Sequence, residues 1–296
     1  MPSSQQQVCI VSNILSMQSH VAYGYVGNRA AVFPLQRLGH EVIAINTVQF
    51  SNHTGYGEWT GDIMSLDHIE RIFEGLEQRG ALKQCDAVLT GYLGAPELGH
   101  TLLKWLTRMR EHNPHLIYCC DPVMGDVGRG VFVKEGVPTF FQNSATPAAT
   151  IMTPNQFELQ LLTDLSINTL LDAQKACQSL HDRGVLHVLL TSLMRQDGHP
   201  NEIEMLLSSK NQGSLLIATP KLPMPTPING SGDATAAIFL AHYLESQNLK
   251  VSFEKTTNSI FALFESTLHE QRRELDLVQG QSAWMAPLKK FDAVNC

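Results

Sequence analysis

A short glycine-rich turn holds the residues of this 296-residue chain that point most clearly to chemistry. The segment 227–237 reads PINGSGDATAA and leads into apolar residues at helical spacing. Backbone N–H groups can converge in a Gly-x-Gly turn because no Cβ blocks the approach, and a helix N-terminus adds about half a positive charge. Gly230, Ser231 and Gly232 are therefore expected to form an anion hole beside the carboxylate of Asp233.

An anion hole next to an ionised carboxylate suits phosphoryl transfer. Asp233 would accept the proton of a hydroxyl group, while the backbone N–H groups hold the charge that spreads over the moving phosphoryl group. The alternative is that Asp233 only caps a core helix, and this short pattern alone does not decide between the two. Signatures of P-loops, dinucleotide-binding folds and H-E-x-x-H zinc proteases are missing, and the chain contains no Gly-Lys pair.

Two acidic clusters each follow a predicted strand. Residues 120–126 read CDPVMGD, and residues 151–158 read IMTPNQFE, in which Pro154 is suited to a helix start. Asp121, Asp126 and Glu158 are expected to meet at one edge of a sheet and to hold Mg²⁺ together with waters and phosphate oxygens. The alternative is that these carboxylates cap helices and turns.

The elements that must position these residues alternate along the chain. Short apolar runs predict strands over 8–12, 41–46, 87–90, 116–120, 151–153 and 185–191. Amphipathic stretches predict helices over 27–38, 65–79 and 96–112, around 173–180 and around 260–268. This alternation predicts one α/β domain over residues 1–296, with a central, mainly parallel sheet, helices on both faces and ligands at the carboxyl ends of the strands.

One insertion interrupts this alternation. Residues 47–61 read TVQFSNHTGYGEWTG, which is too polar for a core and too aromatic for a disordered loop. A flap or small β lid fits this composition, and an ordinary surface hairpin is the alternative.

Composition limits the classes of partner. Hydrophobic residues make up 43% of the chain and the net charge is −7, which fits a globular protein and argues against a nucleic-acid surface. No apolar run reaches the roughly 18 residues of a membrane span, so no membrane partner is expected. The N-terminus lacks the pattern of a signal peptide, and the six cysteines show no C-x-x-C pair. A cytoplasmic protein with buried, reduced thiols is expected.

Taken together, the motifs of the chain resemble those of the pyridoxal kinases of the ribokinase-like superfamily, closest to the bacterial pyridoxal and pyridoxamine kinases. The resemblance rests on MQSHVAYGYVGNRAAVFPLQRLG, NTVQFSNHTGYGEWTG, AVLTGYLG, CDPVMGD, IMTPNQFELQLL, LLTS, GSGD and RRELDLVQ, which run from residue 17 to residue 279. It implies ATP-dependent phosphorylation of the 5′-hydroxymethyl group of pyridoxal, pyridoxine or pyridoxamine. It also implies Mg²⁺ with ATP, a possible use of K⁺, and a homodimer.

The resemblance assigns roles to individual residues. Asp233 would be the general base, next to the backbone of residues 230–232. The vitamer would be contacted by Ser19, Val26, Thr54 and Tyr92. The phosphates, the metal and the nucleotide would be served by Asp121, Asp126, Thr153, Asn155, Glu158, Thr191 and Ser192, with Asp121 and Glu158 as the metal ligands. The segment 218–227, with Lys221 and Leu222, would cover the adenine.

The chain departs from the family pattern at three places. Thr191 stands where some bacterial relatives have lysine, the segment 218–227 contains four prolines, and Gly55 beside Thr54 offers no side chain to the substrate. Rival functions are a kinase for a hydroxymethylpyrimidine or a sugar, and a pyridoxal-binding protein without catalysis. The aromatic-rich insertion favours a flat heteroaromatic ring over a sugar, and an anion hole favours a catalyst over a binder.

Overall fold

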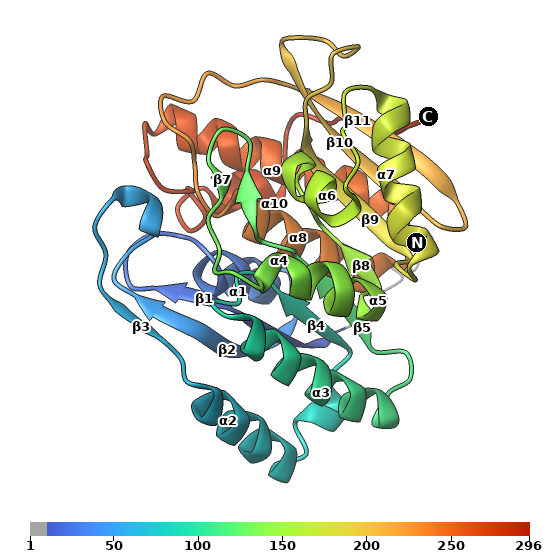
Figure 1. Cartoon of the computed structure of the whole chain (residues 1–296). Helices are drawn as coiled ribbons and strands as arrows, with labels where there is room; N and C mark the ends of the chain where they lie inside the picture. Colours follow the sequence, from blue (N-terminus) through green and yellow to red (C-terminus); the bar gives the residue numbers. More distant parts are fainter. Residues whose placement is uncertain (1–10) are drawn as a thin grey trace, which may run out of the picture.

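A computed structural model of the chain describes residues 11–296. Within them, ten strands form one sheet in the order β12-β11-β10-β9-β8-β5-β4-β1-β2-β3 (Figure 1). The strands are β1 (Asn13–Val21), β2 (Glu41–Phe50), β3 (Gly61–Ile63), β4 (Ala87–Thr90), β5 (Ile117–Cys120), β8 (Ile151–Met152), β9 (His187–Leu193), β10 (Glu202–Ser209), β11 (Gly213–Pro220) and β12 (Val294–Asn295). The six strands from β9 to β2 pair in parallel, whereas β3 at one edge and β10, β11 and β12 at the other pair antiparallel.

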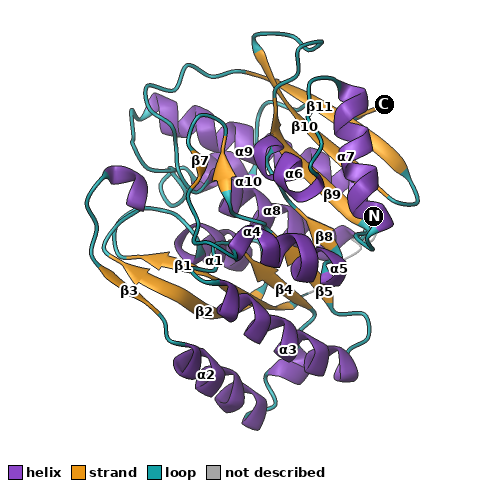
Figure 2. Cartoon of the chain, viewed as in Figure 1, coloured by secondary structure: helices purple, strands orange, loops and turns teal. Residues whose placement is uncertain are grey.

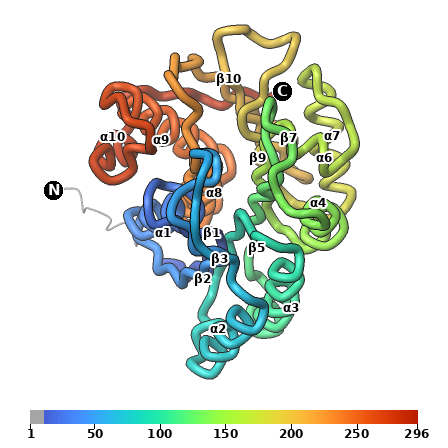
Figure 3. The backbone as a smooth tube through the Cα atoms, turned by 60° about the vertical axis from the view of Figure 1, so that its left-hand side comes forward, coloured from blue at the N-terminus to red at the C-terminus, as the bar shows by residue number. Residues whose placement is uncertain are grey.

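Helices cover both faces of the sheet, as the sequence predicted (Figures 2 and 3). One face is packed by α2 (Leu66–Gln78), α3 (Pro96–His112), α6 (Gln156–Thr163) and α7 (Leu170–Asp182). The other is packed by α1 (Asn28–Arg37), α8 (Ser231–Ser246) and α9 (Leu249–His269). Short elements complete the chain: the hairpin of β6 (Gly125–Asp126) and β7 (Gly130–Val131), the 3₁₀ turns η1 (Thr54–Tyr56) and η2 (Leu82–Gln84), the π-helical turn η3 (Phe141–Ala145), and α4 (Val137–Phe140), α5 (Thr146–Ala148) and α10 (Gln281–Met285).

Several predicted elements are confirmed closely. The predicted strand over 87–90 is β4, and the predicted helix over 96–112 is α3. The N-cap of α2 is Ser65, whose hydroxyl accepts a hydrogen bond from the N–H of His68. The thiols of Cys85, Cys119, Cys120 and Cys177 are buried, while Cys296 is exposed and Cys9 lies outside the described residues.

The predicted first strand over 8–12 is wrong where it can be compared. Residues 8–10 lie outside the described part of the chain, Val11 and Ser12 are not in a strand, and β1 begins at Asn13. The true strand contains Ser16, Gln18 and Ser19, all buried, so it lacks the continuous apolar signature of a central strand.

The predicted helix start near Pro154 is confirmed: Pro154 directly precedes Asn155, the N-cap of α6, and Glu158 lies in the first turn. The strand predicted at 41–46 continues to Phe50, and the hairpin of β10 and β11 was not predicted. Residues 47–61 form the end of β2, the turn η1 and β3, which lie together at one edge of the sheet (Figure 1).

No helix in the described range 11–296 combines the length and the apolar character needed to cross a membrane.

Candidate active site

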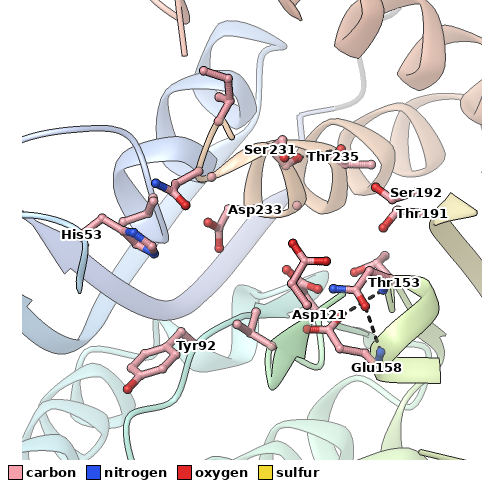
Figure 4. A pocket seen from close by; sticks show the side chains of 18 of the residues that line it. His53, Tyr92, Asp121, Thr153, Glu158, Thr191, Ser192, Ser231, Asp233 and Thr235 are labelled. Atoms are coloured by element: carbon pink, nitrogen blue, oxygen red, sulfur yellow. Dashed lines mark hydrogen bonds between the residues drawn. The ribbon is translucent and has the colours of Figure 1, made fainter. Parts of the chain in front are cut away.

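One cavity of about 720 Å³ opens beyond the carboxyl ends of the parallel strands. Every residue that the sequence assigned to the site lines this cavity: Ser19, Val26, Thr54, Tyr92, Asp121, Asp126, Thr153, Asn155, Glu158, Thr191, Ser192, Lys221, Leu222, Gly230, Ser231, Gly232 and Asp233. Parallel strands end at the same edge of a sheet, which explains how segments far apart in sequence meet here. The close-up in Figure 4 shows Asp233 between two groups, with His53 and Tyr92 on one side and Asp121 and Thr153 on the other.

The predicted glycine-rich turn begins α8. Gly230 is the N-cap with φ of 82°, in the left-handed region that favours glycine, and Ser231 is the first helical residue. The helix is buried along most of its length, because small and apolar residues from Ala234 to Ala241 pack against the sheet and α1. Residues 230–233 line the cavity, and the first N–H groups of a helix have no partner within the helix, which is what an anion hole requires.

Asp233 stands in that first turn. Burial raises the pKa of its carboxyl group to about 6, although hydrogen bonds from the backbone N–H groups of Gly27 and of Asp233 itself act in the opposite direction. At neutral pH the carboxylate is therefore mostly ionised, and it retains a higher proton affinity than an exposed aspartate. This combination is the one expected of a general base.

Asp121 and Glu158 form a second acidic centre. Asp121 follows β5, and Glu158 belongs to the capping box of α6, where its carboxylate accepts hydrogen bonds from the N–H groups of Asn155 (2.9 Å) and Met124 (2.9 Å). Burial and then the neighbouring carboxylate of Glu158 raise the pKa of Asp121 well above its usual range, and burial raises the pKa of Glu158 to about 8.

These two carboxylates suit a divalent cation. The hydroxyl group of Thr153 is buried beside Asp121 without a hydrogen bond of normal geometry. Two crowded carboxylates and a spare hydroxyl oxygen are hard oxygen ligands of the kind that Mg²⁺ accepts. All three predicted carboxylates line the cavity, but residues 11–296 contain no group of three or more Asp, Glu, His or Cys side chains arranged to hold a metal. Asp126 instead lies exposed in the β6–β7 hairpin, where its carboxylate accepts a hydrogen bond from the N–H of Val127.

The far end of the cavity is lined by β9, β10, β11 and the proline-rich segment. Thr191 bridges to Asn155, and Ser192 has a positive φ of 53°. Lys221 and Leu222 lie at the start of the proline-rich segment, and the apolar residues Ile203, Met205, Met224 and Phe264 extend this wall. An apolar slot next to polar groups is typical of a nucleotide-base site.

The near end is aromatic. Ser19 and Val26 contribute from β1 and the loop before α1, and Tyr92 follows β4. The ring centroids of Phe50 and Trp59, both in the 47–61 insertion, lie 4.1 Å apart. Burial keeps the Tyr92 hydroxyl neutral by raising its pKa. This end offers a flat ring both apolar surface and hydroxyl groups.

Sequence reasoning missed several lining residues, among them Phe50, His53, Trp59 and Arg129. The first three lie in the insertion that the sequence analysis singled out, so its aromatic content was the available signal. Arg129 gave no signal, because a lone arginine in a glycine-rich turn is indistinguishable from a surface residue. Its guanidinium Nη1 donates to the Asn229 side chain (3.2 Å), and its charge, after burial, lowers the pKa of His53 to about 4.

Comparison with known proteins agrees with this geometry. Residues 42–274 match the family model described as phosphomethylpyrimidine kinase. The chain is 49% identical to pyridoxal kinase PdxY of Rubrobacter xylanophilus over 94% of this chain and 96% of that protein. It is 47% identical to pyridoxal kinase PdxY of Deinococcus radiodurans over 95% of each chain.

Solved structures agree as well. The pyridoxal kinase of Leishmania donovani in complex with ADP and ginkgotoxin superposes with a TM-score of 0.90 at 31% identity, covering 96% of this chain and 99% of that one. The same enzyme in complex with ADP and pyridoxamine gives a TM-score of 0.89 at 30% identity over the same shares. The chain thus belongs to the phosphomethylpyrimidine kinase family and, within its ribokinase-like fold, to the pyridoxal kinases.

Proposed function

We propose that this protein transfers the terminal phosphoryl group of ATP to the 5′-hydroxymethyl group of pyridoxal, and also of pyridoxine and pyridoxamine. One observation carries the proposal: Asp233 stands at the anion hole of α8, between an aromatic end and a nucleotide-like end of one cavity. The relatives named as pyridoxal kinases, and a solved relative that holds ADP with pyridoxamine, support the same substrates.

The chain's own groups account for the chemical step. The Asp233 carboxylate takes the proton of the vitamer hydroxyl, whose oxygen then attacks the terminal phosphorus while the bond to the ADP oxygen breaks. The N–H groups at residues 230–232 hold the charge on the moving phosphoryl group. The aromatic end, with Ser19, Val26, Thr54 and Tyr92, orients the vitamer ring.

The nucleotide is held at the other end by Thr153, Asn155, Thr191 and Ser192, with Lys221 and Leu222 over the base and Asp126 near the phosphates. Asp121 and Glu158 would hold Mg²⁺, which would neutralise charge on the phosphate oxygens. Use of K⁺ is a prediction from the family resemblance, tested by comparing potassium and sodium chloride in the assay.

We further propose one domain over 1–296 in which residues 47–61 act as a lid, a homodimer, and a cytoplasmic location. The lid is supported by its position at the edge of the cavity, to which it contributes Phe50, His53, Thr54 and Trp59. The dimer and the location follow from the family resemblance, and sedimentation and fractionation test them.

The decisive experiment incubates the protein with Mg-ATP and each vitamer and detects the 5′-phosphates and ADP. A hydroxymethylpyrimidine and a sugar serve as competing substrates, because the matched family model is described by a pyrimidine. Replacement Asp233→Asn should lower turnover about 10²- to 10⁴-fold while binding of both substrates persists. Turnover at the wild-type rate in Asp233→Asn would reject Asp233 as the base, and faster phosphorylation of a competing substrate would reject the vitamers.

A further inference from the structure

The strand β1 carries polar side chains through the core of the sheet. Ser16 and Gln18 have no exposed surface, and Asn28 at the start of α1 is 3% exposed. Burying an amide or hydroxyl group without a partner is unfavourable by a few kcal/mol, so buried polar chains are normally fully hydrogen-bonded. In the network formed by Ser16, Asn28 and Gln18, every side-chain polar atom except Gln18 Oε1 has a hydrogen-bond partner.

The donor and acceptor roles in this network follow from the hydrogen bonds of Asn28. The Asn28 amide nitrogen donates to the carbonyl of Ile45 (3.0 Å) and to the Asn46 side chain (2.8 Å). The Asn28 oxygen must therefore accept, and it receives the Ser16 hydroxyl at 2.8 Å. That hydroxyl in turn accepts from the Gln18 amide nitrogen at 3.0 Å. The Gln18 amide is thus fixed with its oxygen at the free end, and this buried Oε1 has no hydrogen-bond partner.

The free oxygen faces the catalytic aspartate. A Cβ placed on Gly91, after β4, would lie 2.4 Å from Gln18 Oε1 and 3.3 Å from Asp233 Oδ1. The two oxygens are therefore at most about 6 Å apart, a span that one water bridges with two hydrogen bonds of ordinary length. Only a glycine leaves room between them. The other end of the network is also tied to Asp233, because Asn28 follows Gly27, whose N–H donates to the Asp233 carboxylate.

We propose that Gln18 is a positioning residue for Asp233: its fixed Oε1 accepts a hydrogen bond, through one water, from the Asp233 carboxyl group after that group has taken the substrate proton. The proposal deepens the proposed function, because it specifies how the same site holds the proton that the reaction releases. No further proton moves: the O–H bond of the substrate breaks, an O–H bond forms on Asp233, and the hydrogen bond to the acceptor orients it.

An acceptor at this place selects the protonated form of Asp233. A water between the two groups could donate to both oxygens, so the preference comes from charge: the partial negative charge of Gln18 Oε1, close to the Asp233 carboxyl group, disfavours its ionised form. Other groups that face Asp233 across the cavity are Asp121 after β5, and His53 and Tyr92, which are neutral near pH 7 (Figure 4).

The test compares Gln18→Met, which keeps the volume and removes the acceptor, with Ser16→Ala, which keeps Oε1 but releases the amide. In Gln18→Met, kcat should fall on the order of tenfold with the KM values for ATP and pyridoxal within about twofold, and the acid limb of kcat should move to lower pH. Ser16→Ala should show a smaller change of the same kind. A rise in KM with an unmoved acid limb would overturn the proposal.

A second measurement does not depend on activity. Below about pH 6 the wild type should gain thermal stability that Gln18→Met lacks, and this difference should vanish when both carry Asp233→Asn. Gln156→Met is the matched control, because both ends of the buried Gln156 amide bond elsewhere, to Ile167 and Met194. Its stability loss should be independent of pH. A pH-independent loss in Gln18→Met would also overturn the proposal, while Asp233→Asn separately tests the base.

Discussion

Gly230 packs directly against the backbone carbonyl of Tyr25: a Cβ on Gly230 would stand 1.8 Å from that oxygen. The N–H of Tyr25 is held in turn by the Glu274 carboxylate at 2.9 Å. The start of α8 is therefore fixed against the loop before α1 by a backbone contact that no side chain can enter. The proposed anion hole depends on this contact for its place beside the cavity.

Replacement Gly230→Ala should abolish this fit, because the new methyl group clashes with backbone and the φ of 82° is strained for alanine. We expect kcat/KM to fall at least about 10²-fold as the anion-hole donors move. Steady-state kinetics measure the loss. Gly75→Ala is the matched control, since Gly75 lies in α2 with no atom within 4 Å of a new Cβ, and it should raise stability by about 0.5–1 kcal/mol. Wild-type kinetics in Gly230→Ala would show that the contact is dispensable.

The raised pKa of Asp233, about 6, predicts how rate and stability depend on pH. The rate should rise as pH increases through about 6 and then level off, because the ionised form is the base. Stability should move the other way. The folded state holds the proton more tightly than the unfolded state, so stability falls between about pH 4 and pH 6 as the buried group is forced to ionise.

Asp233→Asn removes this effect. Above pH 6 the free energy of unfolding of this variant should exceed that of the wild type by up to about 3 kcal/mol, and its thermal midpoint should be higher. Near pH 4 both quantities should approach the wild-type values. Calorimetry across this range measures the difference. A constant difference at all pH values would mean that Asp233 does not titrate as proposed.

The acidic pair predicts a metal dependence. Glu158→Gln should raise the Mg²⁺ concentration needed for half-maximal activity, because one of two proposed carboxylate ligands loses its charge. Without metal the same variant should relieve the repulsion that acts on Asp121. Titrating Mg²⁺ at fixed, saturating nucleotide measures the first effect. Asp67→Asn, on the exposed surface of α2, is the control. Equal Mg²⁺ requirements in the wild type and Glu158→Gln would exclude Glu158 as a ligand.

The proposed lid predicts a fluorescence signal. Trp105 and Trp284 are at most 1% exposed, whereas Trp59 is 42% exposed and lines the cavity. Pyridoxine binding should therefore change the emission of Trp59 alone, by removing water from its ring. The signal should disappear in Trp59→Phe, whose KM for the vitamer should rise severalfold because the smaller ring makes less contact. An unchanged titration curve in Trp59→Phe would assign the signal to a buried tryptophan and contradict the lid.

Much of the fold could be predicted from the sequence because local sequence signals agreed with the tertiary structure. Pro96 at the start of α3, Ser65 before α2 and the apolar run of β4 each specify an element without help from distant residues. The position of β1 was predicted wrongly because its buried polar side chains form hydrogen bonds with residues outside the strand, such as Asn28 for Ser16. A strand that carries a buried hydrogen-bond network does not show the apolar pattern by which buried strands are recognised.

The residues of the candidate site also fall into those that the sequence could predict and those that it could not. Residues in short motifs after strands, such as Asp121 and Glu158, could be placed at the cavity in advance, since strand ends meet at one edge of a parallel sheet. Arg129 could not, because its position depends on how the β6–β7 hairpin folds back toward Asn229. The exposure of Asp126, which lies in the same hairpin, could not be predicted for the same reason, although Asp126 still lines the cavity beside Glu158.

The order of the strands separates two tasks. The residues proposed to face the vitamer come from β1, β2 and the loop after β4, on one half of the sheet, and the wall proposed to face the nucleotide comes from β9, β10 and β11 on the other. Substitutions that alter which ring is bound can therefore accumulate on one half of the sheet without disturbing the binding of the phosphate donor on the other half. With this architecture, the specificity for the acceptor alcohol can change during evolution while the same nucleotide remains the phosphate donor.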